Sequence, residues 1–219
     1  MRCKPGDRVV LFDGTGTEFS AQVEEVGRTD VQLAILARHE LDRELPAPLT
    51  LGAALPKGER QKWLVEKAVE LGVGRLVPLR TGRSVAQPVE QALARLSRVV
   101  IEASKQCGRN RLMEITQPQD WVDFVEASRE APLRILAHPD GRARQARPCI
   151  PADLWREADP PSAIHLAVGP EGGFTPEEVA LATAAGWQTV SLGPRILRIE
   201  TAAILLVALA TPTLAGREG

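Results

Sequence analysis

The chain has 219 residues, of which 44% are hydrophobic and 25% charged, and its formal net charge is −1. This profile is typical of a folded globular protein and excludes disordered, collagen-like and strongly polyanionic or polycationic chains. The longest apolar run, residues 202–210, is far shorter than the roughly 20 residues that a bilayer requires. We therefore expect a cytoplasmic protein without a membrane anchor.

Short apolar segments fill the first part of the chain, at residues 7–14, 17–27 and 30–37, separated by the turn signals DGTG and GRTD. Such segments predict a small antiparallel unit of short strands. The charged, proline-containing stretch 38–48 reads as a connection to a second domain. We therefore place one β domain at 1–47 and a larger domain at 48–219.

The second domain alternates between strand-like and helix-like segments. Strands are expected at 49–55, 74–80, 133–138, 163–169 and 188–193, and helices at 59–73, 89–107, 120–130, 175–187 and 200–210. This alternation predicts an α/β domain with a mostly parallel sheet. One helix start is especially clear, because Thr175, Pro176 and Glu178 form a capping-box pattern with proline at the first helical position.

Charge is unevenly distributed along the chain. Residues 75–111 contain eight basic and two acidic side chains, a net charge of +6, and the segment 140–148 adds Arg142, Arg144 and Arg147. Arginines on an exposed helix are often merely solvated, but two basic runs in one neutral protein favour a polyanionic partner.

Cysteine and histidine offer no metal-site pattern. The chain contains three of each: Cys3, Cys107, Cys149, His39, His138 and His165. The cysteines include no CxxC pair, and the histidines match no ligand spacing, so neither a disulfide framework nor a metal site is expected. We interpret the histidines as structural, and His138, at the end of an expected strand, is the one best placed to line a cleft.

Two glycine-containing loops follow apolar strands, VGPEGGF at 168–174 and LGPRILRIE at 192–200. In open α/β sheets ligands bind beyond the carboxyl ends of the strands, which is where these loops fall. Neither loop carries a Walker pattern or GxGxxG, and Glu171 would repel a phosphate. The loops therefore favour a neutral or cationic ligand.

Five separated motifs carry a resemblance to a known family: GPEGGFTPEE, SLGPRILRIETAA, ALPKGERQKWLVEKAVELGV, LVPLRTGRSV and EASKQCGRNR. Together they resemble the ribosomal RNA small subunit methyltransferase E family of SPOUT methyltransferases, over nearly the whole chain and in the family's order. The resemblance implies a PUA-like β-barrel, then a SPOUT α/β domain with a deep C-terminal trefoil knot, and a homodimer. The PUA-like module is expected to be truncated, because MRCKPGD resembles the middle of that module.

The same resemblance implies methyl transfer from S-adenosylmethionine to N3 of a uridine in 16S rRNA, within the small ribosomal subunit. Its cofactor contacts fall on Gly169, Pro170, Glu171, Gly172, Leu192, Gly193, Arg195, Ile196, Leu197 and Arg198. Its expected RNA contacts are Lys57, Lys62, Arg80, Arg83, Lys105, Gln106, Arg109 and Arg111. No metal is implied. Ile199 stands where the family pattern leads us to expect threonine.

The chemistry of uracil suggests roles for a few side chains. N3 carries a proton, and as it leaves, negative charge spreads onto O2 and O4, which a guanidinium can stabilise. Arg198 is the first candidate for that role and Arg109 the second. Glu171 or Glu200 is a candidate proton acceptor, and the sequence does not choose between them. Two alternatives stay open: a non-catalytic RNA-binding or ribosome-assembly protein on the same fold, and a tRNA methyltransferase.

Overall fold

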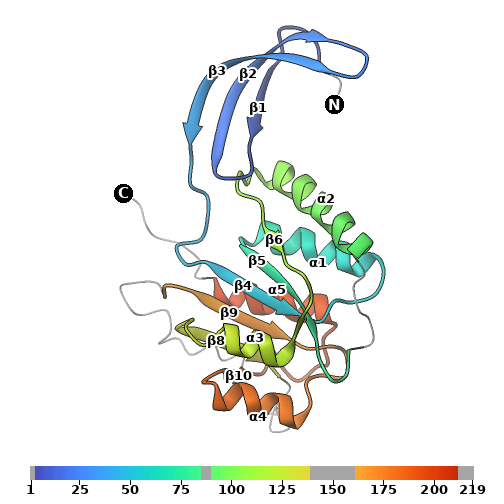
Figure 1. The fold of residues 1–219 in the computed structure, drawn as a ribbon, viewed down its shortest axis with the longest axis vertical. Helices are drawn as coiled ribbons and strands as arrows, with labels where there is room; N and C mark the ends of the chain where they lie inside the picture. Colours follow the sequence, from blue (N-terminus) through green and yellow to red (C-terminus); the bar gives the residue numbers. More distant parts are fainter. Residues whose placement is uncertain (1–2, 85–89, 139–160, 212–219) are drawn as a thin grey trace.

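The computed structural model describes residues 3–84, 90–138 and 161–211. Within them the chain forms two parts, a small antiparallel sheet and a larger parallel sheet packed between helices (Figure 1). The small sheet stands at one end of the molecule and is joined to the rest by the segment that precedes β4 (Leu49–Ala53). No helix in these ranges is both long enough and apolar enough to cross a membrane.

The small sheet has the order β1 (Arg8–Phe12), β2 (Thr17–Val26) and β3 (Val31–Glu40), and both pairings are antiparallel. These strands confirm the three predicted from the apolar segments. In the turn between β1 and β2, Gly14 and Gly16 have φ angles of 84° and 110°, a region that side-chain-bearing residues rarely adopt. The glycines of the DGTG signal therefore make this turn possible.

The large sheet has seven strands, and every pairing among its described strands is parallel. The strand order is β10-β8-β9-β4-β5-β6, and β7 also pairs with β5. The strands not yet given are β5 (Arg75–Arg80), β6 (Glu114–Ile115), β7 (Gln119–Asp120), β8 (Leu133–Ala137), β9 (Ile164–Val168) and β10 (Gln188–Val190). The predicted parallel α/β architecture is confirmed.

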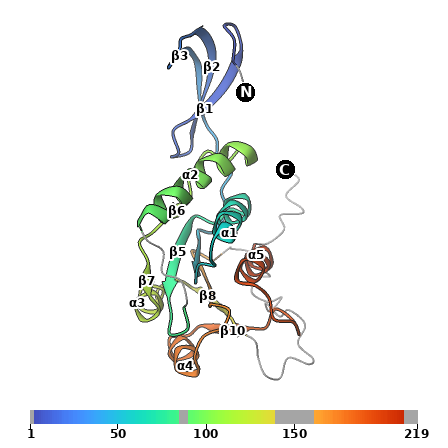
Figure 2. The same cartoon turned by 90° about the vertical axis from the view of Figure 1, so that its right-hand side faces the viewer.

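Helices cover both faces of this sheet (Figure 2). They are α1 (Glu59–Glu70), α2 (Glu90–Cys107), α3 (Trp121–Ala127), α4 (Pro176–Ala184) and α5 (Ile199–Ala210). Because strand side chains alternate between faces, Leu76 and Leu166 enter the core under α1, α2 and α5, whereas Val77 and Ala167 enter the core under α3 and α4. Both faces are buried, which explains why the central strands β4, β5, β8 and β9 are mostly apolar on both faces.

The two parts of the chain meet at the loop that follows α2. Leu112 N–H donates to the Gly14 carbonyl at 3.0 Å, and the Asn110 side chain donates to the carbonyls of Gly16 and Leu41 at 3.2 and 2.8 Å. Asn110 is 1% exposed, so these hydrogen bonds from its side-chain amide are made in the interior. The motif that ends α2 therefore docks the small sheet onto the larger domain.

Candidate functional site

The two glycine loops identified in the sequence lie together and line one pocket of about 320 Å³. The first loop follows β9 and the second follows β10, so both leave the carboxyl edge of the parallel sheet. The pocket is lined by Arg83, Ala137, His138, Val168, Gly169, Pro170, Glu171, Gly172, Gly173, Phe174, Leu192, Gly193, Arg195, Ile196, Leu197, Ile199 and Ala202. Its walls are largely backbone and apolar side chains, as in most small-molecule sites.

Every residue to which the sequence assigned a cofactor contact lines this pocket except Arg198. Arg198 is the N-cap residue of α5 and is exposed, between the pocket-lining residues Leu197 and Ile199. His138 also lines the pocket, as its position at the end of β8 suggested. Thus the structure brings the two loops together, and the identity of their ligand rests on other evidence.

Close packing explains the glycines of the first loop. A Cβ atom at Gly169 would lie 2.9 Å from the Phe174 ring, and one at Gly172 would lie 3.3 Å from the Arg83 side chain. Phe174 is buried against Trp121, with ring centroids 4.4 Å apart, in the core beneath α3 and α4. The loop is therefore supported from behind by a fixed aromatic cluster.

A capping box holds the helix that follows this loop. The Thr175 hydroxyl accepts from Glu178 N–H at 3.2 Å, and the Glu178 carboxylate accepts from Thr175 N–H at 2.8 Å. The predicted capping box is thus confirmed, with Pro176 at the first position of α4. The cap fixes where the glycine loop ends.

The Arg60 side chain lies between Glu171 and Glu200, the two carboxylates predicted from the sequence as proton acceptors. Arg60 Nη1 is 3.6 Å from Glu171 Oε1 and 3.8 Å from Glu200 Oε1. The Glu200 side chain is only 6% exposed, and its Oε2 atom is buried without a hydrogen-bond partner among the described residues. The cluster carries a formal net charge of −1 beside the pocket. Sequence reasoning missed Arg60, and its place in the KGER motif was the one available signal.

Arg109 lies away from the pocket, in the interior of the molecule. Its side chain is 5% exposed and donates to both carboxylate oxygens of Glu44, in the connection between the two parts. Its remaining terminal nitrogen donates to the carbonyls of Val69 and Val73 at 3.3 and 2.7 Å. It does not line the pocket. A guanidinium so fully engaged is placed for a structural role at the connection between the two parts, and its expected catalytic and RNA-contacting roles stay predictions.

Two other arginines and the one lysine of the basic run 75–111 are also paired with acids. Arg75 and Glu114, Arg80 and Asp120, and Lys105 and Glu102 approach within 2.8–2.9 Å. Glu114 and Asp120 lie next to these arginines in space but outside residues 75–111 in sequence. The net charge of +6 counted along this run therefore overstates the positive charge around it. The second basic run, with Arg142, Arg144 and Arg147, lies outside the described residues, as does Cys149.

The remaining residues with expected RNA contacts are on the surface. Those that are exposed are Lys57, Lys62, Arg83, Lys105, Gln106 and Arg111. Lys62 and Gln106 line one groove between α1 and α2. Arg83 stands apart from that groove and lines the pocket instead, where it donates to the Gly172 carbonyl at 2.7 Å.

His165 is a structural histidine, as expected. Its Nδ1 atom lies 2.8 Å from the Ser128 hydroxyl, and its ring stacks on Phe124. Burial, together with the positive charges of Arg75 and Arg134, lowers the pKa of His165 from 6.5 to about 4. Across residues 3–84, 90–138 and 161–211 no cluster of three histidine, cysteine or acidic side chains is arranged to hold a metal ion.

Comparison with known proteins assigns both parts of the chain. Residues 43–211 match the RNA methyltransferase domain family, and residues 1–36 match the RNA methyltransferase PUA domain. The chain is 36% identical over 213 residues to the ribosomal RNA small subunit methyltransferase E of Synechocystis, covering 95% of this chain and 67% of that protein. It is 32% identical to the enzyme of the same name from Mycobacterium bovis, covering 92% of this chain and 77% of that one.

Solved structures agree with these sequence matches. A ribosomal RNA small subunit methyltransferase E from Neisseria gonorrhoeae, bound to S-adenosylmethionine, superposes with a TM-score of 0.80 at 31% identity, over 94% of this chain and 83% of that one. A Legionella pneumophila protein in complex with the same cofactor gives a TM-score of 0.79 at 33% identity, over 94% and 83%. The domain match, the sequence identities and the superposed structures lead to one assignment: this chain belongs to the ribosomal RNA small subunit methyltransferase E family of RNA methyltransferases.

Proposed function

We propose that this chain transfers the methyl group of S-adenosylmethionine to N3 of a uridine in 16S rRNA, and that the pocket between its two glycine loops holds the cofactor. The chain is a member of an S-adenosylmethionine-dependent rRNA methyltransferase family. The observation that carries the proposal for the site is the meeting of the two loops in one pocket at the carboxyl edge of the sheet.

The pocket suits this cofactor in size, lining and charge. A volume of about 320 Å³ falls at the lower end of the range for small-molecule sites. Its glycine and proline backbone allows close approach of an adenosine edge, which requires donors and acceptors. The net negative cluster of Arg60, Glu171 and Glu200 favours a bound sulfonium cation.

The cofactor supplies an electrophilic methyl carbon, and the residues of this chain prepare the uridine to attack it. In our proposal Glu171 accepts the N3 proton, because it lines the pocket and its side chain is exposed, whereas the Glu200 carboxylate is nearly buried and does not line the pocket. Arg198, exposed at the start of α5, donates to the oxygens of the uracil ring as they gain negative charge. Holding both reactants in line supplies much of the acceleration.

The RNA-binding surface, in this proposal, includes Lys57, Lys62, Arg83, Gln106 and Arg111, which are exposed. Lys105 and Arg80 belong to it more weakly, because Glu102 and Asp120 partly neutralise them. We place the division between an RNA-binding PUA-like domain and a SPOUT methyltransferase domain at residues 47 and 48, and we propose a C-terminal knot in the second domain.

A homodimer is also part of the proposal. Helix α5 is apolar on its outward side as well, where Ile204, Leu205 and Leu209 are only partly buried. Ile196, in the second glycine loop, is 94% exposed. An apolar surface of this kind next to a pocket favours burial by a second copy of the chain.

The test is mass mapping of 16S rRNA after small ribosomal subunits are incubated with the protein and isotope-labelled S-adenosylmethionine. We expect one added labelled methyl group on a single uridine, at N3. A labelled product on free tRNA instead would overturn the substrate, and cofactor binding measured by calorimetry without any product would favour the non-catalytic alternative.

A further inference from the structure

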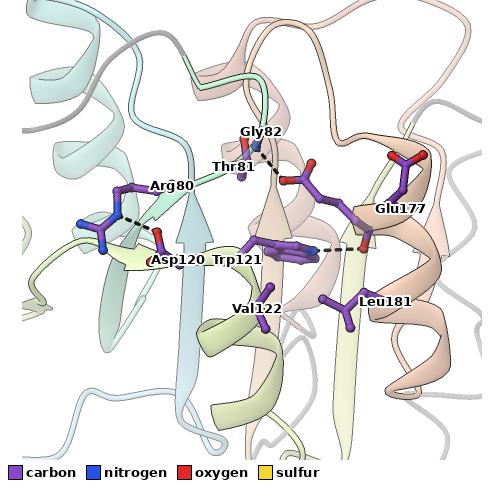
Figure 3. A pocket seen from close by; sticks show the side chains of 9 residues that line it. Arg80, Thr81, Gly82, Asp120, Trp121, Val122, Glu177 and Leu181 are labelled. Carbon is purple, nitrogen blue, oxygen red and sulfur yellow. Dashed lines mark hydrogen bonds and ion pairs between the residues drawn. The ribbon is translucent and has the colours of Figure 1, made fainter.

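Glu178 does more than cap its helix. Its Oε2 atom accepts from Thr175 N–H at 2.8 Å, which completes the capping box. Its Oε1 atom accepts from Gly82 N–H at 2.7 Å, in the turn that follows β5. Figure 3 shows this bond bridging the two segments. One carboxylate thus joins the end of the first glycine loop to a turn far away in sequence, through hydrogen bonds strengthened by its charge.

A second contact joins the same two segments on the side of the pocket between the two glycine loops. Arg83, next to Gly82, donates through Nη1 to the Gly172 carbonyl at 2.7 Å. The two segments are in close contact. A Cβ atom at Gly82 would lie 3.3 Å from the Thr175 methyl group, and one at Gly172 would lie 3.3 Å from the Arg83 side chain. Glycine at both positions allows the turn to pack directly on the loop.

Each segment is also held by hydrogen bonds of its own. The turn is closed on itself by Thr81 and Ser84, whose backbone and hydroxyl groups are 2.9–3.0 Å apart. The first turn of α4 is held by buried Trp121, whose indole N–H donates to the Glu178 carbonyl at 3.0 Å (Figure 3). Glu178 therefore connects two pre-formed pieces, and its two hydrogen bonds set their relative position.

We propose that Glu178 is a positioning residue for methyl transfer, because it fixes the cofactor-binding glycine loop and the RNA-facing Arg83 as one unit. Arg83 both lines the pocket and is exposed, so it stands where the pocket meets the outer surface. A ligand that fixes the glycine loop relative to the turn after β5 also fixes Arg83, so less conformational entropy is lost when RNA then binds. Cofactor and RNA therefore bind with positive coupling, and the coupling is reciprocal. This inference rests on the proposed function.

The test measures RNA affinity with and without S-adenosylhomocysteine, the demethylated product of the cofactor, for wild type and two matched variants. For wild type we expect RNA to bind about 5-fold tighter or more when S-adenosylhomocysteine is present, in the usual range of such couplings. Glu178→Gln keeps the shape of the side chain but has one acceptor oxygen instead of two. It therefore loses one of the two hydrogen bonds from Gly82 N–H and Thr175 N–H, and with it the bridge between them. In this variant we expect the ratio of affinities to fall to about 1.

The matched control is Glu177→Gln. Glu177 is on the same turn of α4, is exposed, and lies within the field of Arg83, so the variant loses the same charge without losing the bridge to Gly82. We expect it to keep the wild-type ratio. If Glu178→Gln does not fold, Arg83→Lys provides the second route, since it keeps the charge but loses the guanidinium bond to Gly172; we expect its ratio to fall as well.

The outcomes separate the inference from the proposed function. Equal RNA affinities with and without S-adenosylhomocysteine in an active wild type would overturn the inference and leave the function standing. A wild-type ratio in Glu178→Gln, or an equal loss in Glu177→Gln, would also overturn it. A wild type that binds neither S-adenosylmethionine nor S-adenosylhomocysteine would overturn both.

Discussion

Replacing Arg109 with methionine tests whether this residue holds the two parts of the chain together. The variant keeps much of the side-chain volume but leaves the Glu44 carboxylate without its partner and removes the guanidinium bond to the Val73 carbonyl, whereas the Val69 carbonyl still accepts from Gly72 N–H. Removing one member of a buried ion pair costs about 3–5 kcal/mol. Because Glu44 is 19% exposed and water reaches it, we expect about 3 kcal/mol, the lower end of that range.

This loss is measurable by thermal denaturation. For a domain of this size about 1 kcal/mol shifts the unfolding midpoint by roughly 2–4 °C, so we expect a decrease of about 6–12 °C. The control is Arg111→Met, an exposed neighbour, for which we expect a change within about 0.5 kcal/mol. At a temperature where Arg109→Met is folded, its affinity for S-adenosylmethionine is expected to equal that of wild type. An unchanged midpoint combined with weakened RNA binding would refute the reasoning and return Arg109 to the RNA surface.

Three further predictions concern the loops, the proposed role of Arg198 and acid stability. Gly193→Ala places a side chain at φ 112° with no atom within 4 Å of the new Cβ, so its effect is backbone strain alone. We expect calorimetry to show weaker binding of S-adenosylmethionine. The control Gly6→Ala, at φ 93° and equally open, is expected to leave this binding unchanged. Arg198→Ala is expected to abolish methylation and keep cofactor affinity; wild-type turnover would contradict its role. The depressed pKa of His165 means that the unfolded chain binds a proton more readily between pH 6.5 and about 4, so stability is complete above pH 6.5 and falls as the pH drops through this window. The full shift corresponds to about 3 kcal/mol, and with solvent screening of the half-buried ring we expect about 1–2 kcal/mol. We expect urea unfolding at a series of pH values to show a smaller loss of stability between pH 6.5 and 4 for His165→Asn than for wild type. Identical pH profiles for the two proteins would contradict this role of His165.

Local patterns predicted the parts of the fold that depend on neighbours in sequence. The capping box at Thr175 and Glu178 is a short-range arrangement, and it forms as the pattern indicates. The glycine loops were found because parallel strands bring their carboxyl ends to one edge, a general property of the α/β class. The pairing of those loops in one pocket follows from the same property.

Contacts that depend on the path of the chain could not be predicted in this way. Arg60 reaches Glu200 because α1 and α5 pack together on one face of the sheet, and it reaches Glu171 in the loop that follows β9; no local pattern predicts either contact. The burial of Arg109 against Glu44, Val69 and Val73 is another such contact, because these partners are 36 to 65 residues away in the sequence. Glu178 shows the same limit at a finer scale, since its cap was visible in the sequence but its bond to Gly82 was not.

The strand order also determines when the protein can fold during synthesis. Strand β4 pairs with β5 soon after it is made, but its other edge pairs with β9, from Leu49 opposite Ile164 to Ala53 opposite Val168. Until the ribosome has released that later segment, an apolar strand of the nascent chain keeps an open edge, which is a site for aggregation. The β1–β3 sheet closes locally and needs no such wait. We therefore expect the β1–β3 sheet to be able to form earlier during translation than the parallel sheet, in which one edge of β4 stays open until β9 is made.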